Sequence, residues 1–248
     1  MLVHGSVTGG RPSWVSQRAG LRRRFELVVV ERAGFPPNPP VEHVDFDDHA
    51  EQLASQLRPG DHLVGHSYGG VISLLAAARL GDRLGSLTVI EPPCTRVALG
   101  DAAADRFAED GRRWWAEGPR DGLEAFLRGF LRYVGSTFDP PRPLPADLEQ
   151  GARTLLVERG PWEAEIPLDD LATATYPKLV VSGAHHAAFD AICDVLERRL
   201  DAERLILPGY GHAPQLHPGF NDALTSFIDR ASSSHDTRSA HGDRTNAK

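Results

Sequence analysis

One short stretch, GHSYG at residues 65–69, constrains the fold of this chain more than any other. The apolar residues Leu63 and Val64 before it indicate the end of a β-strand. After it, residues 71–80 are apolar, rich in alanine and free of glycine and proline, which predicts a buried helix. A serine between two glycines, placed between a strand and a helix, is typical of a nucleophile elbow. In such a turn the serine hydroxyl stands above the sheet and faces the free N–H groups of the helix.

Ser67 is therefore the candidate nucleophile. Gly65 and Gly69 flank it because a side chain at either position would collide with the neighbouring strand or helix. A serine hydroxyl needs a base at neutral pH, and histidine titrates in the right range. His212 is the candidate base, since it ends the loop PGYGH at residues 208–212 after the last predicted strand. The alternative interpretation is a glycine-rich turn that holds an ordinary serine.

Strands and helices alternate along most of the chain, which predicts an α/β fold with a mostly parallel sheet of about six strands and helices on both faces. Ser67 and His212 both follow strand ends, where open α/β sheets bind ligands. The predicted strands are residues 2–4, the run ending at residue 64, and 25–30, 86–90, 178–182 and 203–207. The predicted helices are residues 11–24, 45–58, 71–80, 188–200 and 218–228.

Composition excludes several classes of protein. A net charge of −7 argues against nucleic-acid binding. Cys94 and Cys193 have neither a disulfide framework nor metal-ligand spacing, so each is expected to be a small buried residue. The chain shows no signal peptide and no apolar run long enough to span a membrane. We therefore expect a soluble, cytoplasmic protein that needs no metal or cofactor.

The motif GHSYGG, together with LVHGS at residues 2–6 and the stretch from PGYGH to residue 228, resembles the α/β-hydrolase family over residues 2–230. The resemblance implies an oxyanion hole made by the backbone N–H groups of Ser6 and Tyr68. It also implies a core at residues 1–94 and 177–230 and a helical cap at residues 95–176, inserted after the strand that ends at Ile90.

Two regions depart from that pattern or lie outside it. The family's sheet usually has two strands before the one at residues 2–4, so either the fold is trimmed here or the natural chain begins further upstream. At the other end, residues 231–248 have almost no apolar content and are expected to be disordered.

The acid that should orient His212 is a further departure. In most of the family it follows the strand at residues 178–182, at the position occupied here by His186, which cannot serve. Glu91, at the end of the preceding strand, is one substitute, as in haloalkane dehalogenases. Asp190, in the first turn of a helix, is another, although it can also simply compensate the helix dipole. A Ser67–His212 dyad is the third alternative.

The resemblance implies a serine hydrolase, of the carboxylic ester hydrolase type, that cleaves an ester, thioester or lactone of a hydrophobic small molecule through an acyl-enzyme. Trp114 and Trp115 in the predicted cap are candidates for substrate contact, with packing of the cap onto the core as the alternative. A lyase, isomerase or cyclase on the same fold, or a ligand-binding protein without activity, are the rival functions. The oligomeric state stays open.

Overall fold

A computed structural model describes the backbone of residues 1–242 and the side chains of residues 1–232. Its centre is a six-stranded, all-parallel sheet with the strand order β2-β1-β3-β4-β5-β6, which confirms the predicted fold class. The strands are β1 (Leu2–Val3), β2 (Val29–Val30), β3 (His62–His66), β4 (Ser86–Ile90), β5 (Lys178–Ser182) and β6 (Glu203–Ile206).

The sheet is shortest on the side of β1 and β2. We expected a strand at residues 25–30, but only Val29 and Val30 form one. β2 is short because its partner strand β1 has only two residues. Leu2 pairs with Val29, and Val3 pairs with Val30. The long ladders run between β3, β4 and β5, whose apolar residues are buried because helices cover both faces of the sheet.

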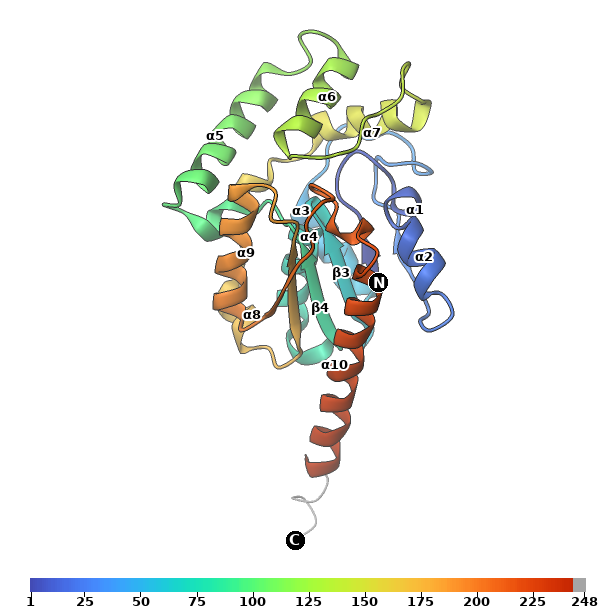
Figure 1. Ribbon diagram of the computed structural model, residues 1–248, viewed down its shortest axis with the longest axis vertical. Helices are drawn as coiled ribbons and strands as arrows, with labels where there is room; N and C mark the ends of the chain where they lie inside the picture. The colour runs from blue at the N-terminus through green and yellow to red at the C-terminus, as the bar shows by residue number, and fades with distance from the viewer. Residues whose placement is uncertain (243–248) are drawn as a thin grey trace.

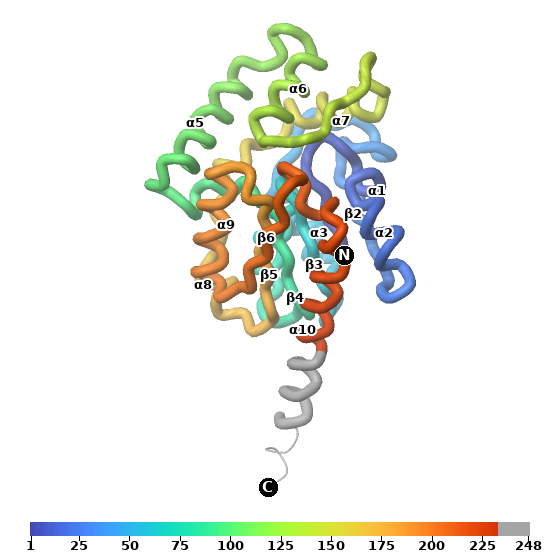
Figure 2. Tube along the Cα trace, viewed as in Figure 1, coloured from blue at the N-terminus to red at the C-terminus, as the bar shows by residue number. Residues whose placement is uncertain are grey.

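Helices pack on both faces of this sheet (Figure 1). On one face lie α3 (Phe46–Gln56), α4 (Tyr68–Leu80), α8 (Leu168–Thr173) and α9 (Ala187–Leu200). The other face is covered by α2 (Val15–Leu21), which follows the short α1 (Gly10–Ser13), and by α10 (Phe220–Gly242). Figure 2 shows β5 beside α9 and β2 beside α1, and each of these pairs is in contact.

Helix α3 forms where its sequence pattern predicts it. The carboxylate of Asp45 caps the helix by accepting a hydrogen bond from the N–H of Asp47 at 2.7 Å. Its apolar side chains recur at helical spacing, so Phe46, Ala50 and Leu53 all point into the core. Helix α3 thereby packs along α4 and supports it from the outside.

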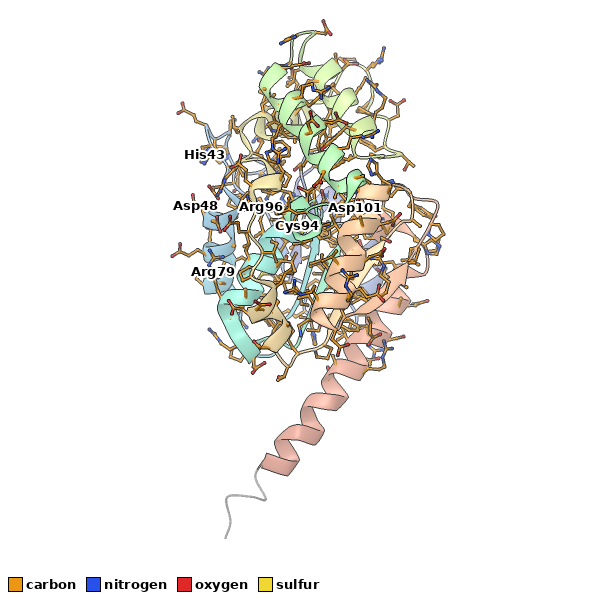
Figure 3. The ribbon with its side chains drawn as sticks, turned by 90° about the vertical axis from the view of Figure 1, so that its left-hand side faces the viewer. His43, Asp48, Arg79, Cys94, Arg96 and Asp101 are labelled. Carbon is orange, nitrogen blue, oxygen red and sulfur yellow. The ribbon has the colours of Figure 1, made fainter. Side chains whose placement is uncertain are left out.

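Between β4 and β5 the chain forms α5 (Ala102–Glu117), α6 (Leu123–Tyr133) and α7 (Ala146–Val157), which lie together beyond one end of the sheet (Figure 1). They share an apolar cluster that includes Phe107, Phe126 and Phe130 and that continues into α9 through Phe189. Asp101, labelled in Figure 3, caps α5 by accepting hydrogen bonds from the N–H groups of Ala103 and Ala104. The later part of the same segment returns to the sheet, because Leu171 of α8 is buried in the core beside α4 and α9.

The last helix is longer than the sequence suggests. We expected residues 231–248 to be disordered, but α10 continues to Gly242, and only residues 243–248 lie outside the described part of the chain. Residues 229–241 contain neither glycine nor proline, and extending a helix costs far less than starting one. Helix α10 therefore covers residues 231–242, where the composition alone indicates disorder.

Three further expectations concern the cysteines and the helices. Both cysteines are buried and unpaired, as predicted, and burial raises the pKa of Cys193 to about 12. The helix predicted at residues 71–80 begins earlier, at Tyr68, because it starts directly behind Ser67. None of the described helices is both long enough and apolar enough to cross a membrane.

Candidate active site

The site begins with strained backbone at the ends of three neighbouring strands. Ser67, between β3 and α4, has φ 54° and ψ −124°, a conformation that L-residues rarely adopt. Glu91 and Ala184, just after β4 and β5, also have positive φ values of 44° and 49°. Such outliers persist only where surrounding structure enforces them, and they cluster at functional sites.

The two glycines of the motif allow the tight turn. A Cβ atom on Gly69 would lie 2.5 Å from the carbonyl oxygen of Val3, and one on Gly65 would collide with the side chain of Ser73. The close approach of α4 to β1 and β3 therefore requires glycine at both positions. It places Ser67 at the N-terminus of α4, where the positive end of the helix dipole lies.

Ser67, His212 and Glu91 are joined by two hydrogen bonds. His212 Nε2 lies 2.9 Å from Ser67 Oγ, and His212 Nδ1 lies 2.7 Å from Glu91 Oε2. All three side chains are buried. Because a carboxylate can only accept, Nδ1 carries the ring proton and Nε2 is free to accept the proton of the serine hydroxyl.

Glu91 is held in place by two further donors. The N–H of Gly183 donates to Oε1 at 2.7 Å, and His185 Nε2 donates to Oε2 at 2.9 Å. Burial alone would raise the pKa of Glu91, but the hydrogen bonds from His185, His212 and Gly183 outweigh it and lower the pKa to about 2. The carboxylate is therefore ionised at neutral pH although no part of it is exposed.

His185 was missed in the sequence, where only His186 was considered. The available signal was its place two residues after Gly183, at the end of β5, next to the usual position of the acid. His186 does something different: its Nδ1 accepts a hydrogen bond from the N–H of Ala188 at 3.2 Å and caps α9.

Asp190 is not part of this cluster. It lies in the first turn of α9, partly exposed, and its nearest charged partner is Arg204, whose Nη2 lies 3.9 Å away. Of the two carboxylates considered from the sequence, the structure brings Glu91 to His212 and directs Asp190 elsewhere.

Neighbouring groups fix the ring of His212. Phe189 stacks on it with ring centroids 4.3 Å apart, and His66 Nε2 donates to the carbonyl oxygen of His212 at 2.7 Å. Burial, followed by the proximity of His212, lowers the pKa of His66 to about 3, so His66 is neutral at physiological pH. It serves as a fixed donor to the His212 backbone.

The predicted oxyanion donors are available. Among the hydrogen bonds described for residues 1–232, neither the N–H of Ser6 nor that of Tyr68 has a protein acceptor. The Ser6 loop is anchored by a buried ion pair, because Ser6 Oγ donates to Glu158, and Glu158 Oε1 lies 2.6 Å from Nη2 of Arg32. Arg32 Nη1 also donates to the carbonyl oxygen of Gly5 at 2.9 Å, so two adjacent residues of the loop are held by the same ion pair.

Two cavities meet at Ser67. The small cavity lies beneath α5, α6 and α7 and is lined by Ser6, Tyr68, Glu158 and a group of aromatic side chains that includes Trp115. The large cavity lies on the other side of Ser67 and is lined by His212, among others. Of the two tryptophans predicted as substrate contacts, only one lines either of these cavities.

Trp115 faces the small cavity, whereas Trp114 lines neither of the two. The ring of Trp114 packs against Phe126 and approaches Gly129, so its role is to hold α5 against α6. Trp162 also lines the small cavity and was missed, since nothing in its local sequence indicates which way it points.

Glu91, His185 and His212 are also the described residues whose ligand atoms could hold a metal ion, since those atoms lie within 4.8 Å of one another. Their geometry is already that of a hydrogen-bonded set. Each ring nitrogen involved points at Glu91 Oε2, at 2.7 and 2.9 Å. A metal ion at this point would have to displace both hydrogen bonds and take the Nδ1 proton of His212.

Comparison with known proteins gives a consistent picture. A model of the alpha/beta hydrolase family matches residues 1–220. Among solved structures, the chain is similar to a thermophilic esterase from Thermogutta terrifontis, with 19% identity, a TM-score of 0.70, and coverage of 93% of this chain and 89% of that one. It is also similar to MenH from S. aureus, with 15% identity, a TM-score of 0.71 and 93% coverage of both chains. A carboxylesterase structure from Nitrososphaera gargenis has 16% identity and a TM-score of 0.69, and the match covers 94% of this chain and 90% of the other.

Proposed function

This chain belongs to the alpha/beta hydrolase family, and we propose that it is a serine hydrolase that cleaves a carboxylic ester, thioester or lactone through an acyl-enzyme. The observation that carries the proposal is the buried hydrogen-bonded chain from Ser67 Oγ through His212 to Glu91. Ser67 acts as the nucleophile, His212 as the general base and Glu91 as the carboxylate that orients the imidazole.

In the first half of the reaction, Ser67 Oγ attacks the carbonyl carbon while His212 Nε2 takes the hydroxyl proton. The carbonyl oxygen becomes negatively charged, and the N–H groups of Ser6 and Tyr68 stabilise it. The tetrahedral intermediate then collapses. The bond to the leaving oxygen or sulfur breaks, and His212 Nε2 delivers its proton to that atom, leaving an acyl group on Ser67.

In the second half, water replaces the leaving group. His212 Nε2 takes a proton from the water as it attacks the acyl carbon, and the same two N–H groups stabilise the second oxyanion. Collapse of this intermediate releases the carboxylic acid and returns the proton to Ser67 Oγ. The ionised Glu91 stabilises the imidazolium each time it forms, which requires a carboxylate that stays deprotonated.

The helices α5, α6 and α7 act in this proposal as a cap over the site. They supply most of the aromatic wall of the small cavity, including Phe107, Trp115 and Phe130. An aromatic cap of this kind excludes water from the site and favours a hydrophobic small molecule as substrate.

The test is hydrolysis of p-nitrophenyl acetate by the wild-type protein and by the variants Ser67→Ala and His212→Ala. We expect each variant to lose on the order of 10⁶-fold in turnover, because nucleophile and base act as one unit. Circular dichroism should be unchanged in both. A folded variant that keeps near wild-type turnover would contradict the role assigned to its residue.

A further inference from the structure

The two cavities at Ser67 differ greatly in size. The small cavity has about 20 Å³ of free volume and the large cavity about 510 Å³. A water molecule needs roughly 10–15 Å³ by this measure, so the small cavity has room for about one methyl or ethyl group. The large cavity has the size of a site for a drug-sized ligand.

The position of His212 decides which part of a substrate enters which cavity. The leaving atom must receive a proton from His212 Nε2, so it has to lie within hydrogen-bond reach of that nitrogen. His212 lines the large cavity and not the small one, whereas Tyr68 lines only the small one. The leaving alcohol therefore extends into the large cavity, and the acyl group points into the small one. Phe130 and Val134 of the α6 region line both cavities and form the partition.

The walls of the small cavity are fixed against widening. Trp115 packs edge-on against Trp162 with ring centroids 5.2 Å apart, and its Nε1 donates to the carbonyl oxygen of Leu155 at 3.2 Å. On the opposite wall the hydroxyl of Tyr133 donates to the carbonyl oxygen of Phe107 at 2.6 Å, and the two rings stack at 4.2 Å. A longer acyl chain would have to break these contacts.

The large cavity is suited to an uncharged, mainly apolar group. Apolar side chains such as Leu148, Phe138 and Leu216 line it, and the last two are 45% and 42% exposed. The one charged side chain among its described lining residues is the carboxylate of Asp147. A leaving group with phosphates, such as coenzyme A, would meet no lysine or arginine in this lining.

We propose that the substrate is a short-chain ester, with an acetyl or propionyl group as the acyl part and a bulky, uncharged, mainly apolar alcohol as the leaving group. This inference rests on the proposed serine hydrolase function and adds the substrate class. Trp115 and Trp162 are the residues that limit the acyl chain.

The predicted limit on acyl-chain length is tested with p-nitrophenyl esters that share one leaving group and differ in the length of the acyl chain. Wild-type kcat/KM should fall by at least about tenfold from propionate to hexanoate, because even one methylene that does not fit costs about tenfold or more. Trp115→Leu should raise the hexanoate-to-acetate ratio by at least about tenfold. Trp114→Leu, the same change at the adjacent residue that lines neither cavity, should leave that ratio unchanged. If Trp115→Leu does not fold, Trp162→Leu replaces it.

A wild-type preference for hexanoate, or an equal shift in the Trp114→Leu variant, would overturn the assignment of the small cavity.

The predicted preference for an uncharged, apolar leaving group is tested with two acetyl thioesters. S-benzyl thioacetate, whose leaving group is an alkyl thiol like that of coenzyme A, should be cleaved with a kcat/KM more than about tenfold above that of acetyl-coenzyme A, and the reverse order would overturn it. Hydrolysis that depends on Ser67 but favours long acyl chains refutes only this inference. The absence of any Ser67-dependent hydrolysis refutes the proposed function as well.

Discussion

Glu91 accepts three hydrogen bonds while fully buried, and the proposed mechanism is most sensitive to this residue. Replacing its carboxylate with an amide keeps the shape but offers His212 Nδ1 a group that can also donate. We expect Glu91→Gln to lower kcat by roughly 10²- to 10⁴-fold through the wrong histidine tautomer. Asp190→Asn should cost less than about tenfold, because Asp190 lies at the start of α9 beside Arg204.

Measuring kcat for both variants at the pH optimum separates the alternatives. The reverse ranking would assign the orienting role to Asp190. Two mild effects would indicate that Ser67 and His212 work as a dyad.

The ionised carboxylate of Glu91 should also make the free energy of unfolding depend on pH in the acid range. The pKa of Glu91 in the folded protein, about 2, lies below its ordinary value of 4.5, so the ionised form stabilises the fold. This contribution is fully present above about pH 4.5 and is lost as the pH falls toward 2, at up to about 1.4 kcal/mol per pH unit. Urea denaturation at about pH 6 and pH 3 should show a larger loss for the wild type than for Glu91→Gln. Equal losses would contradict the low pKa.

At the scale of elements, the junction of β3 and α4 depends on glycine at residue 69. A methyl group there would meet the backbone carbonyls of Val3 and His4, which cannot rotate away. We expect Gly69→Ala to destabilise the protein by about 3 kcal/mol or more. Gly70→Ala is the matched control, because the nearest atom to its Cβ outside its own helix turn would be a side-chain carbon of Pro92 at 3.1 Å. This change should cost about 1 kcal/mol or less. Thermal denaturation of both variants gives the comparison, and similar losses would argue against the steric requirement.

Elements made of buried apolar runs could be predicted closely. Residues 86–90 and 178–182 are strands with the expected bounds, since both faces of each strand are covered and, apart from Lys178, every residue is apolar or small. The strand expected at residues 25–30 is shorter because its length is set by its partner β1, which local sequence does not reveal. The extension of α10 past residue 230 was missed for a related reason, since low hydrophobicity does not by itself end a helix.

For the whole molecule, the site draws on segments far apart in sequence. Ser67 and His212 could be identified because each lies in a local pattern with its own geometric meaning. His185 and Trp162 could not, because their relevance depends on what the fold places opposite them: Glu91 for the first and Trp115 for the second. The choice between Glu91 and Asp190 likewise needed the positions of β4 and α9 relative to the His212 loop.

The large and small cavities are also properties of the assembled molecule. Their lining comes from the N-terminal loop, from α5, α6 and α7, and from the loop that carries His212. The ion pair between Arg32 and Glu158 links these parts, because Glu158 ends α7 and contacts Ser6 in the N-terminal loop. The C-terminal end of α7 and the proposed oxyanion hole are therefore held in one arrangement.

The central claim is that Ser67 is a nucleophile activated by His212. Incubation of the purified protein with a fluorophosphonate probe, followed by peptide mass spectrometry, tests it directly. The account predicts covalent labelling on the peptide that contains Ser67, loss of labelling in Ser67→Ala, and strongly slowed labelling in His212→Ala with its circular dichroism unchanged. An unlabelled wild-type protein, or labelling that proceeds at the wild-type rate without His212, would contradict it.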